Sequence, residues 1–116
     1  MKFGQRNKYN ATRASYNGVM YDSALERNMA IVLDDHLKSG RLKSVNRQHK
    51  IDLVVNGYRV TTHIVDFLVE LPDGRFKFIE SKGFPTELWR FKMKLTVALN
   101  PGIEYLVNPT DRQIFL

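Results

Sequence analysis

Two tight-turn signals divide the middle of the chain into three consecutive strands, and they constrain the fold more than any other feature. Residues 56–57 (Asn-Gly) are a strong signal for a two-residue β-hairpin, and residues 72–74 (Pro-Asp-Gly) mark a second turn. The strand-like segments around these turns are residues 43–55, 58–71 and 75–82. The sequence therefore predicts a meander of three antiparallel strands.

A helical pattern precedes the meander and another follows it. The first helix is predicted over residues 23–39, with Gly40 as its stop. Its apolar stripe consists of Leu25, Met29, Val32, Leu33 and Leu37. The second helix follows residues 83–86 and runs to Leu99. Its stripe consists of Leu88, Phe91, Leu95 and Ala98. A strand over residues 103–107 completes the order α-β-β-β-α-β, which predicts an α/β fold with a small mixed sheet flanked by helices.

The length of 116 residues fits one domain over residues 1–116, because ~100–200 residues per domain is usual. Residues 1–16 show no sustained hydrophobic period and predict a basic extended arm. The apolar tail 114–116 has no clear place in the six-element core. Because there is no apolar run of membrane-spanning length and the chain starts with polar residues, we expect a soluble cytoplasmic protein.

Charge and side-chain inventory narrow the functional classes. The chain has 18 Lys and Arg against 12 Asp and Glu, and this net charge of +6 favours a polyanionic partner such as nucleic acid. The absence of cysteine excludes disulfide scaffolds, thiol catalysis and cysteine-ligated metals. The three histidines lack the spacing of a zinc site, and we expect His36 to be solvated. There is no Gly-x-Ser-x-Gly nucleophile elbow and no phosphate-binding glycine loop.

Charged residues interrupt the apolar parity of two strands. On the second strand, Asp66 shares its parity with Tyr58, Val60, Thr62, Ile64 and Leu68. On the third strand, Glu80 and Lys82 share theirs with Phe76 and Phe78. Because alternate residues of a strand point to the same face, the charged groups are predicted to point inward. The turn between these strands makes them antiparallel neighbours, which brings Asp66 and Glu80 together on one face.

Glu26 shows the same anomaly on the first helix. It shares a face with Met29, Ala30, Leu33 and Leu37. Buried carboxylates are rare unless they are paired, hydrogen-bonded or bound to a cation, so a cluster of three acids and a lysine indicates a divalent metal. Magnesium prefers oxygen ligands, which Asp66, Glu80 and the backbone carbonyl of Ser81 could supply. Lys82 would then orient or help to deprotonate the attacking water.

Each of these residues also has a purely structural explanation. Ser23 and Glu26 have the spacing of a helix capping box, in which the glutamate reaches back to the helix start. Asp66, Glu80 and Lys82 could form a cross-strand ion pair at the edge of the sheet. The conjunction of all four charged residues favours the functional interpretation.

The constellation resembles the PD-(D/E)XK nuclease superfamily. Its members look like α-β-β-β-α-β cores with an acid on the first helix, an acid ending the second strand, and Glu-x-Lys on the third. The matching positions are Glu26, Asp66 in Ile64-Val65-Asp66-Phe67, and Glu80 and Lys82 in Ile79-Glu80-Ser81-Lys82-Gly83. Val65 stands where a proline is usual. The resemblance implies a restriction-endonuclease-like core.

Further segments are similar to a phage-borne endonuclease family that itself resembles Holliday junction resolvases. They are residues 16–26, Arg47-Gln48, 82–86 and 92–95, within a resemblance that covers residues 8–107. The resemblance implies a phage-encoded DNA endonuclease that depends on Mg²⁺, with Mn²⁺ as a substitute, and that hydrolyses phosphodiester bonds in branched DNA. It also implies that Gln48 is a second-tier polar residue near the site.

Residue roles follow from this resemblance together with the chemistry. Asp66 and Glu80 would bind the metal, Lys82 would assist the attacking water, and Glu26 would complete the metal shell through water or position Lys82. Basic residues expected to contact the DNA backbone are Lys2, Arg6, Lys8, Arg13, Arg90 and Lys94. Since one acidic cluster cuts one strand, paired cuts predict a homodimer. For a phage-encoded chain, the compartment is the cytoplasm of the bacterial host.

Other classes of function stay open. A non-catalytic nucleic-acid-binding or scaffold protein could keep a nuclease-like fold and use the acids as structural ion pairs. A nuclease directed at RNA and a small phage protein that inhibits its host are further alternatives.

Overall fold

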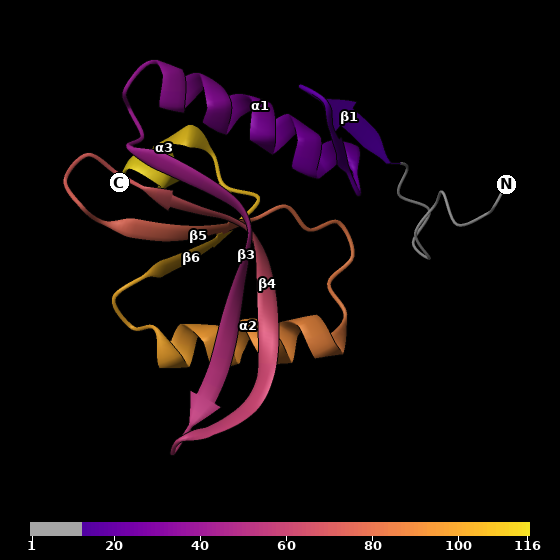
Figure 1. Ribbon diagram of the computed structural model, residues 1–116, viewed down its shortest axis with the longest axis vertical. Coiled ribbons are helices and arrows are strands. Elements are labelled where there is room, and N and C mark those ends of the chain that lie inside the picture. The colour runs from indigo at the N-terminus through magenta and orange to yellow at the C-terminus, as the bar shows by residue number, and fades with distance from the viewer. Residues whose placement is uncertain (1–12) are drawn as a thin grey trace, which may run out of the picture.

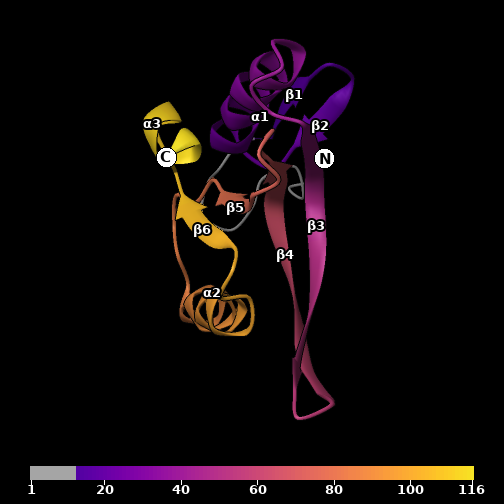
Figure 2. The same cartoon turned by 90° about the vertical axis from the view of Figure 1, so that its left-hand side faces the viewer.

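The computed structural model describes residues 13–116, so Lys2, Arg6 and Lys8 of the predicted arm lie outside the described residues. Its main feature is a twisted four-stranded sheet with helices on both faces (Figures 1 and 2). The helices are α1 Ala24–Lys38, α2 Glu87–Leu99 and α3 Asp111–Phe115. Helices α1 and α3 cover one face of the sheet and α2 lies against the other (Figure 2). The predicted α/β fold with a small mixed sheet flanked by helices is confirmed.

The main sheet has the spatial order β3-β4-β5-β6. Its strands are β3 Ser44–Val55, β4 Tyr58–Glu70, β5 Phe76–Glu80 and β6 Glu104–Val107. The first three are antiparallel neighbours, as the turn signals predict, and β6 adds parallel to β5. Asn56 and Gly57 have φ values of 52° and 78°, the geometry of a type I′ hairpin turn. Strand β5 ends at Glu80, two residues before its predicted end.

A small hairpin lies where part of the arm was predicted. Its strands, β1 Ala14–Tyr16 and β2 Val19–Tyr21, pair with each other at the start of α1. Their turn is a second Asn-Gly pair, with φ of 52° at Asn17 and 77° at Gly18. The predicted boundary of the arm at residue 16 is therefore wrong, because the hairpin signal that locates the β3–β4 turn also occurs here.

The core lies between the sheet and the helices α1 and α3. On α1 the buried residues are Glu26, Ala30, Leu33 and His36, whereas Leu25, Val32 and Leu37 of the predicted stripe are exposed. The predicted solvation of His36 is wrong, because α3 covers it. The His36 ring packs edge-to-face on Phe115, and its Nε2 lies 3.1 Å from the Asp111 carboxylate.

The C-terminal tail packs on its own chain as helix α3. Ile114 is fully buried in the core. The buried Lys77 of β5 donates from Nζ to the backbone carbonyl of Gln113 at 3.1 Å. Residues 114–116 therefore belong to the packed fold, which the sequence pattern did not predict.

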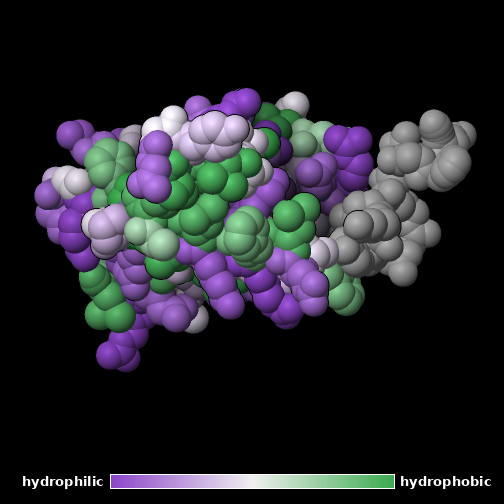
Figure 3. Space-filling model, turned by 90° about the horizontal axis from the view of Figure 1, so that it is seen from below, coloured by the Kyte–Doolittle hydropathy of each residue, from purple (hydrophilic) through white to green (hydrophobic). Residues whose placement is uncertain are grey.

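Two predicted apolar faces are exposed. On β4 the buried side chains are His63, Val65, Phe67 and Val69, whereas Tyr58, Val60 and Ile64 are exposed. The prediction had the wrong parity because the core shared with α1 contains Phe67 and Val69, so the odd-numbered side chains of β4 are the buried ones. The outer part of the β3–β4 hairpin projects beyond the body (Figure 2). On α2, Leu88 is 63% and Phe91 55% exposed. Figure 3 shows hydrophobic side chains gathered on the face seen from below, where α2 lies.

None of the helices within residues 13–116 is long and apolar enough to cross a membrane.

Candidate active site

The predicted acidic cluster assembles at the junction of α1 with the middle of the sheet. Glu26 lies in the first turn of α1, Asp66 on β4, and Glu80 at the end of β5. Glu26 and Glu80 are each only 4% exposed, and Asp66 is partly buried. Three carboxylates from three separate elements therefore lie within electrostatic range of one another.

Glu26 does not complete a capping box. Ser23 caps α1 by accepting the backbone N–H of Glu26 at 3.2 Å. The Glu26 carboxylate instead accepts a hydrogen bond from Gln48 Nε2 at 2.9 Å, and its Oε2 lies 3.7 Å from Arg47 Nη2. The cap thus fixes the helix start, while the carboxylate points to the sheet. This contact places Gln48 beside the cluster, as its second-tier assignment expects.

The β3–β4 ladder is distorted at Gln48. The ladder pairs Arg47 with Phe67 and His49 with Val65 but omits the position between them. There Gln48 has a φ of 55°, a left-handed conformation that costs about 1–3 kcal/mol in a residue other than glycine. Backbone strain of this kind is concentrated at functional sites. The distortion supports a functional role for this part of the sheet.

Asp66 and Glu80 form a carboxyl pair. The β4–β5 register pairs Phe67 with Ile79, and its continuation sets Asp66 opposite Glu80. The two carboxyl groups interact electrostatically at close range, and Asp66 Oδ2 accepts the backbone N–H of Ser81 at 2.8 Å. Their predicted proximity on one face is therefore confirmed.

Burial raises the pKa values of all three carboxyl groups in the cluster. Burial, followed by the nearby charge of Asp66, raises the pKa of Glu26 from 4.5 to about 7, against the opposing effect of Arg47. Burial also raises the pKa of Asp66, and the neighbouring Glu80 raises it further. The pKa of Glu80 is raised by burial too, although a hydrogen bond from Tyr105 opposes the shift. Strongly perturbed pKa values of this kind are concentrated at functional sites.

Lys82 follows β5 on a segment held by Asn108. The Asn108 side chain accepts the Lys82 backbone N–H and donates to the Lys82 carbonyl, both at 2.9 Å. The Lys82 Nζ lies 5.4 Å from the centroid of the Trp89 ring, and its charge lowers the pKa values of Asp66 and Glu80. Lys82 is thus close to the carboxyl pair. The described contacts of Glu26 are to Gln48 and Arg47, so nothing in residues 13–116 links Glu26 directly to Lys82.

A hydrogen-bonded chain behind Glu80 was not predicted. The Tyr105 hydroxyl donates to Glu80 Oε1 at 2.6 Å, and His63 Nε2 lies 2.8 Å from the same hydroxyl oxygen. Burial, with the charges of Lys92 and Lys82, lowers the pKa of His63 to about 4. A neutral His63 therefore donates to Tyr105, which donates to Glu80. No sequence pattern singles out His63 or Tyr105, because the two residues become neighbours only through the order of the strands in the sheet.

The candidate DNA-contacting residues inside the described range are Arg13, Arg90 and Lys94. Arg13 precedes β1, and its Nε is 3.9 Å from the carboxylate of Asp22. Arg90 and Lys94 are exposed on α2. Their exposure is compatible with the predicted backbone contacts, which stay a prediction.

We expect Glu26→Gln to stabilise the fold above pH 7 in the absence of divalent cations. Because the pKa of Glu26 is raised on folding, its contribution to stability is complete below pH 4.5 and is lost as the pH rises through about 7. A neutral glutamine keeps the helix start and avoids the buried charge, which is worth about 2–3 kcal/mol at pH 8. Denaturant unfolding at pH 4 and pH 8 measures the difference. The exposed Glu87, also in a first helical turn, provides the control Glu87→Gln, and an equal gain there would contradict the prediction.

The fold and the site define an α/β domain with a buried acidic cluster. The chain belongs to a family described as "Protein of unknown function (DUF1064)", whose model matches residues 6–104. The matched range contains Glu26, Gln48, Asp66, Glu80 and Lys82. No curated protein and no solved structure matches the chain. The resemblance to PD-(D/E)XK nucleases stays a prediction.

Proposed function

We propose that the protein is an Mg²⁺-dependent endonuclease that hydrolyses phosphodiester bonds in DNA. The observation that carries this proposal is the buried cluster of Glu26, Asp66 and Glu80, brought together from α1, β4 and β5, with Lys82 beside it. A fold gains nothing in stability from collecting three desolvated acids. The excess of basic residues supports a polyanionic substrate.

The donor set suits a small, oxygen-preferring cation. Within residues 13–116, no three His, Asp or Glu side chains are grouped closely enough to hold one ion by themselves. Two carboxylates, from Asp66 and Glu80, and the Ser81 carbonyl would hold it, which matches the habit of magnesium to bind few protein ligands and keep several waters. The buried Ser81 hydroxyl oxygen also has no hydrogen-bond partner among these residues. When bound, the cation would neutralise charge on the phosphate and promote formation of hydroxide near neutral pH.

The chain's own residues would supply orientation and proton handling. Lys82, on its segment fixed by Asn108, would orient the attacking water and stabilise the developing charge. Glu26, whose pKa is near 7, would exchange a proton with water at the edge of the cluster. Arg47, within 3.7 Å of Glu26, would contact the DNA backbone.

A second candidate function is non-catalytic DNA binding. The raised pKa values of Asp66 and Glu80 favour it, because a protonated carboxyl group is stable in a buried position without any cation. In that case the cluster is a structural element, and the basic surface alone carries the activity.

The proposal is tested by incubating the purified protein with labelled four-way junction, duplex and single-stranded DNA. We expect cleavage with Mg²⁺ or Mn²⁺ and none in excess chelator, with the four-way junction cut fastest. Calcium should support binding with little cleavage, because its longer and looser coordination misplaces the water. Undiminished cleavage in excess chelator would refute the metal mechanism, and binding without cleavage under every condition would favour the second function.

We further propose that the protein acts as a homodimer, and the exposed apolar stripe of α2 supports this. A two-fold pair of α2 helices would cover Leu88 and Phe91, which single chains leave in water. We expect sedimentation to show a dimer for the wild type and a monomer for Leu88→Glu. A wild-type protein that sediments as a monomer with and without a four-way junction would contradict the prediction.

Tyr105→Phe is expected to weaken metal binding by about 10- to 100-fold, because it removes the hydrogen bond that orients Glu80. Saturating Mg²⁺ should restore most of the cleavage rate, which a general packing defect would not allow. Calorimetric titration with Mn²⁺ and the Mg²⁺ dependence of cleavage measure the effect. Tyr16→Phe is a matched control, since the Tyr16 hydroxyl makes a 2.6 Å hydrogen bond to the Asp34 carboxylate outside the cluster. Equal metal affinities for the two variants would show that Tyr105 does not act through Glu80.

A further inference from the structure

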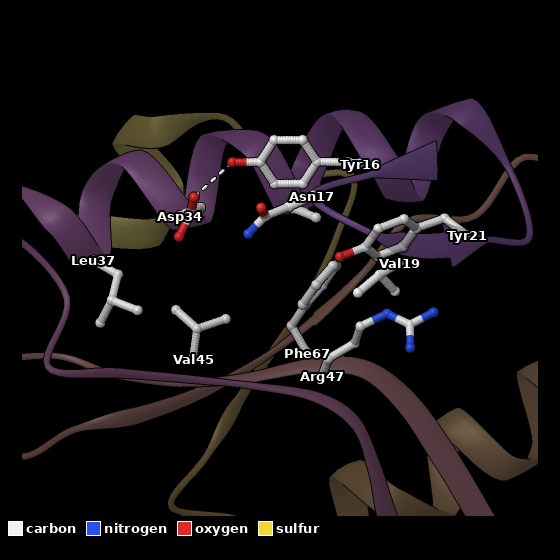
Figure 4. Close-up of a pocket in the computed structure, with 10 residues that line it drawn as sticks. Tyr16, Asn17, Val19, Tyr21, Asp34, Leu37, Val45, Arg47 and Phe67 are labelled. Carbon is white, nitrogen blue, oxygen red and sulfur yellow. Dashed lines mark hydrogen bonds between the residues drawn. The ribbon is translucent and has the colours of Figure 1, made fainter. Parts of the chain in front are cut away.

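A cavity of about 160 Å³ lies between the β1–β2 hairpin, α1 and the strands β3 and β4 (Figure 4). Three aromatic side chains line it: Tyr16, Tyr21 and Phe67. Three polar side chains reach it as well: Asn17, Asp34 and Arg47. The cavity thus combines apolar walls with several hydrogen-bonding groups, a composition that suits a small organic group with both apolar and polar parts.

The walls of the cavity are fixed by contacts within the fold. The Tyr16 hydroxyl donates to Asp34 Oδ2 at 2.6 Å, which ties the hairpin to α1. Phe67 is 1% and Tyr21 5% exposed, so both are held rigidly by the core. The hairpin therefore forms a wall of the cavity rather than a loose flap.

Arg47 links the cavity to the acidic cluster. Its guanidinium carbon lies 4.4 Å from the centroid of the Tyr21 ring, inside the lining. Its Nη2 lies 3.7 Å from Glu26 Oε2. A group bound in the cavity would be one side chain away from a carboxylate of the proposed catalytic centre.

We propose that this cavity receives one unpaired nucleobase of the DNA strand whose phosphate lies at the acidic cluster. The inference rests on the proposed endonuclease function and specifies its substrate class as DNA with an unpaired nucleotide next to the cleaved bond. An uninterrupted duplex cannot fill the cavity unless a base leaves the stack, which costs free energy.

Size and chemistry both select a single-ring base. An apolar cavity of about 150 Å³ can hold a benzene molecule in another protein, so this cavity matches a pyrimidine ring. Among the aromatic side chains of the lining, Tyr16 is partly exposed, and a base can stack on its ring because every base has a π-face. Phe67 and Tyr21 are buried and close the floor of the cavity. Asn17 presents an amide with no hydrogen-bond partner in residues 13–116, and Asp34 and Arg47 add an acceptor and a donor. These groups can bind the polar edge of a base, which an aliphatic ligand lacks.

The experiment compares two DNA duplexes that differ only at one bulged position, which carries either thymidine or an abasic site. Binding is measured by fluorescence anisotropy in Ca²⁺, and cleavage is measured in Mg²⁺. We expect the wild type to bind and cut the thymidine bulge about tenfold or more better than the abasic bulge, because stacking on an aromatic wall is lost without the base. Equal values for the two duplexes would overturn the inference.

Val19→Phe fills the cavity from the hairpin, and Val54→Phe makes the same change on the exposed part of β3. We expect Val19→Phe to bind and cut both duplexes as weakly as the wild type binds and cuts the abasic duplex. Val54→Phe should keep the full preference for the thymidine bulge. Asn17→Gly suits the positive φ at that position and removes the amide without filling the cavity. It should retain the fold and lower the preference several-fold, which keeps the test decisive if Val19→Phe does not fold. Full preference in both cavity variants would overturn the inference.

The two proposals fail in different ways in this experiment. If the wild type prefers the thymidine bulge in Ca²⁺ but cuts no DNA in Mg²⁺, the endonuclease function fails and the base-binding cavity stands. If the protein cuts both duplexes equally, the endonuclease function stands and the cavity does not bind a base.

Discussion

Asp66→Asn and Glu80→Gln are expected to lower DNA cleavage by about 10³-fold or more, while DNA affinity changes only a few-fold. The metal contributes several kcal/mol of charge stabilisation in such reactions, and each substitution removes one of the two carboxylates that would hold it. Glu80 is buried and Asp66 is partly buried, and this burial raises both pKa values. Their amide isosteres therefore remove an unfavourable buried charge and are expected to leave the fold at least as stable above pH 7.

The measurements for these variants are cleavage in Mg²⁺, anisotropy in Ca²⁺ and thermal unfolding on the same preparations. Asp73→Asn is the matched control, because Asp73 lies in the exposed turn between β4 and β5 and interacts with Arg75. It should cleave at the wild-type rate. If Asp66→Asn unfolds the protein while the folded fraction keeps its specific activity, the carboxyl pair is structural and the metal role is wrong.

Turn chemistry is the part of the fold that local sequence predicts best. The hairpin at Asn56-Gly57 requires positive φ values, and few residues other than Asn and Gly tolerate them, so the signal is local and strong. The helix starts at Ser23 and Thr86 are equally local, since each hydroxyl accepts a backbone N–H three residues on. By contrast, which face of a helix or strand is covered depends on distant elements. The stripe of α2 and the outer parity of β4 were wrong for this reason.

The candidate site shows the same division. Asp66 and Glu80 could be placed together because one turn fixes the register of β4 against β5. Tyr105 could not be found, because the parallel pairing of β6 with β5 sets it beside Phe78 only once the crossover through α2 is known. Gln48 reaches Glu26 through a distorted backbone that alternation does not describe. Local patterns thus identify the acids, whereas the partners that hold them depend on the assembled sheet.

Lys82→Ala is expected to lower the cleavage rate by about 10²–10⁴-fold without changing metal or DNA affinity by more than a few-fold, because a positioned group that handles the proton of the attacking water contributes in that range. The substitution is expected to keep the geometry of the site, because the Asn108 side chain bonds only to the backbone N–H and carbonyl of Lys82.

For Lys82→Ala, single-turnover cleavage at saturating Mg²⁺ measures the cleavage rate, and calorimetric titration with Mn²⁺ measures the metal affinity. Lys94→Ala on the exposed face of α2 is the control, and it should reduce DNA affinity and its salt dependence slightly while leaving the saturated rate unchanged. If Lys82→Ala cleaves DNA at a rate close to that of the wild type, Lys82 has no role in the cleavage step. Its charge then only offsets those of the carboxyl groups of Asp66 and Glu80, and its ammonium group lies near the Trp89 ring. If metal affinity and cleavage rate fall together in Lys82→Ala, Lys82 acts through Asp66 and Glu80, because its positive charge favours their ionised forms.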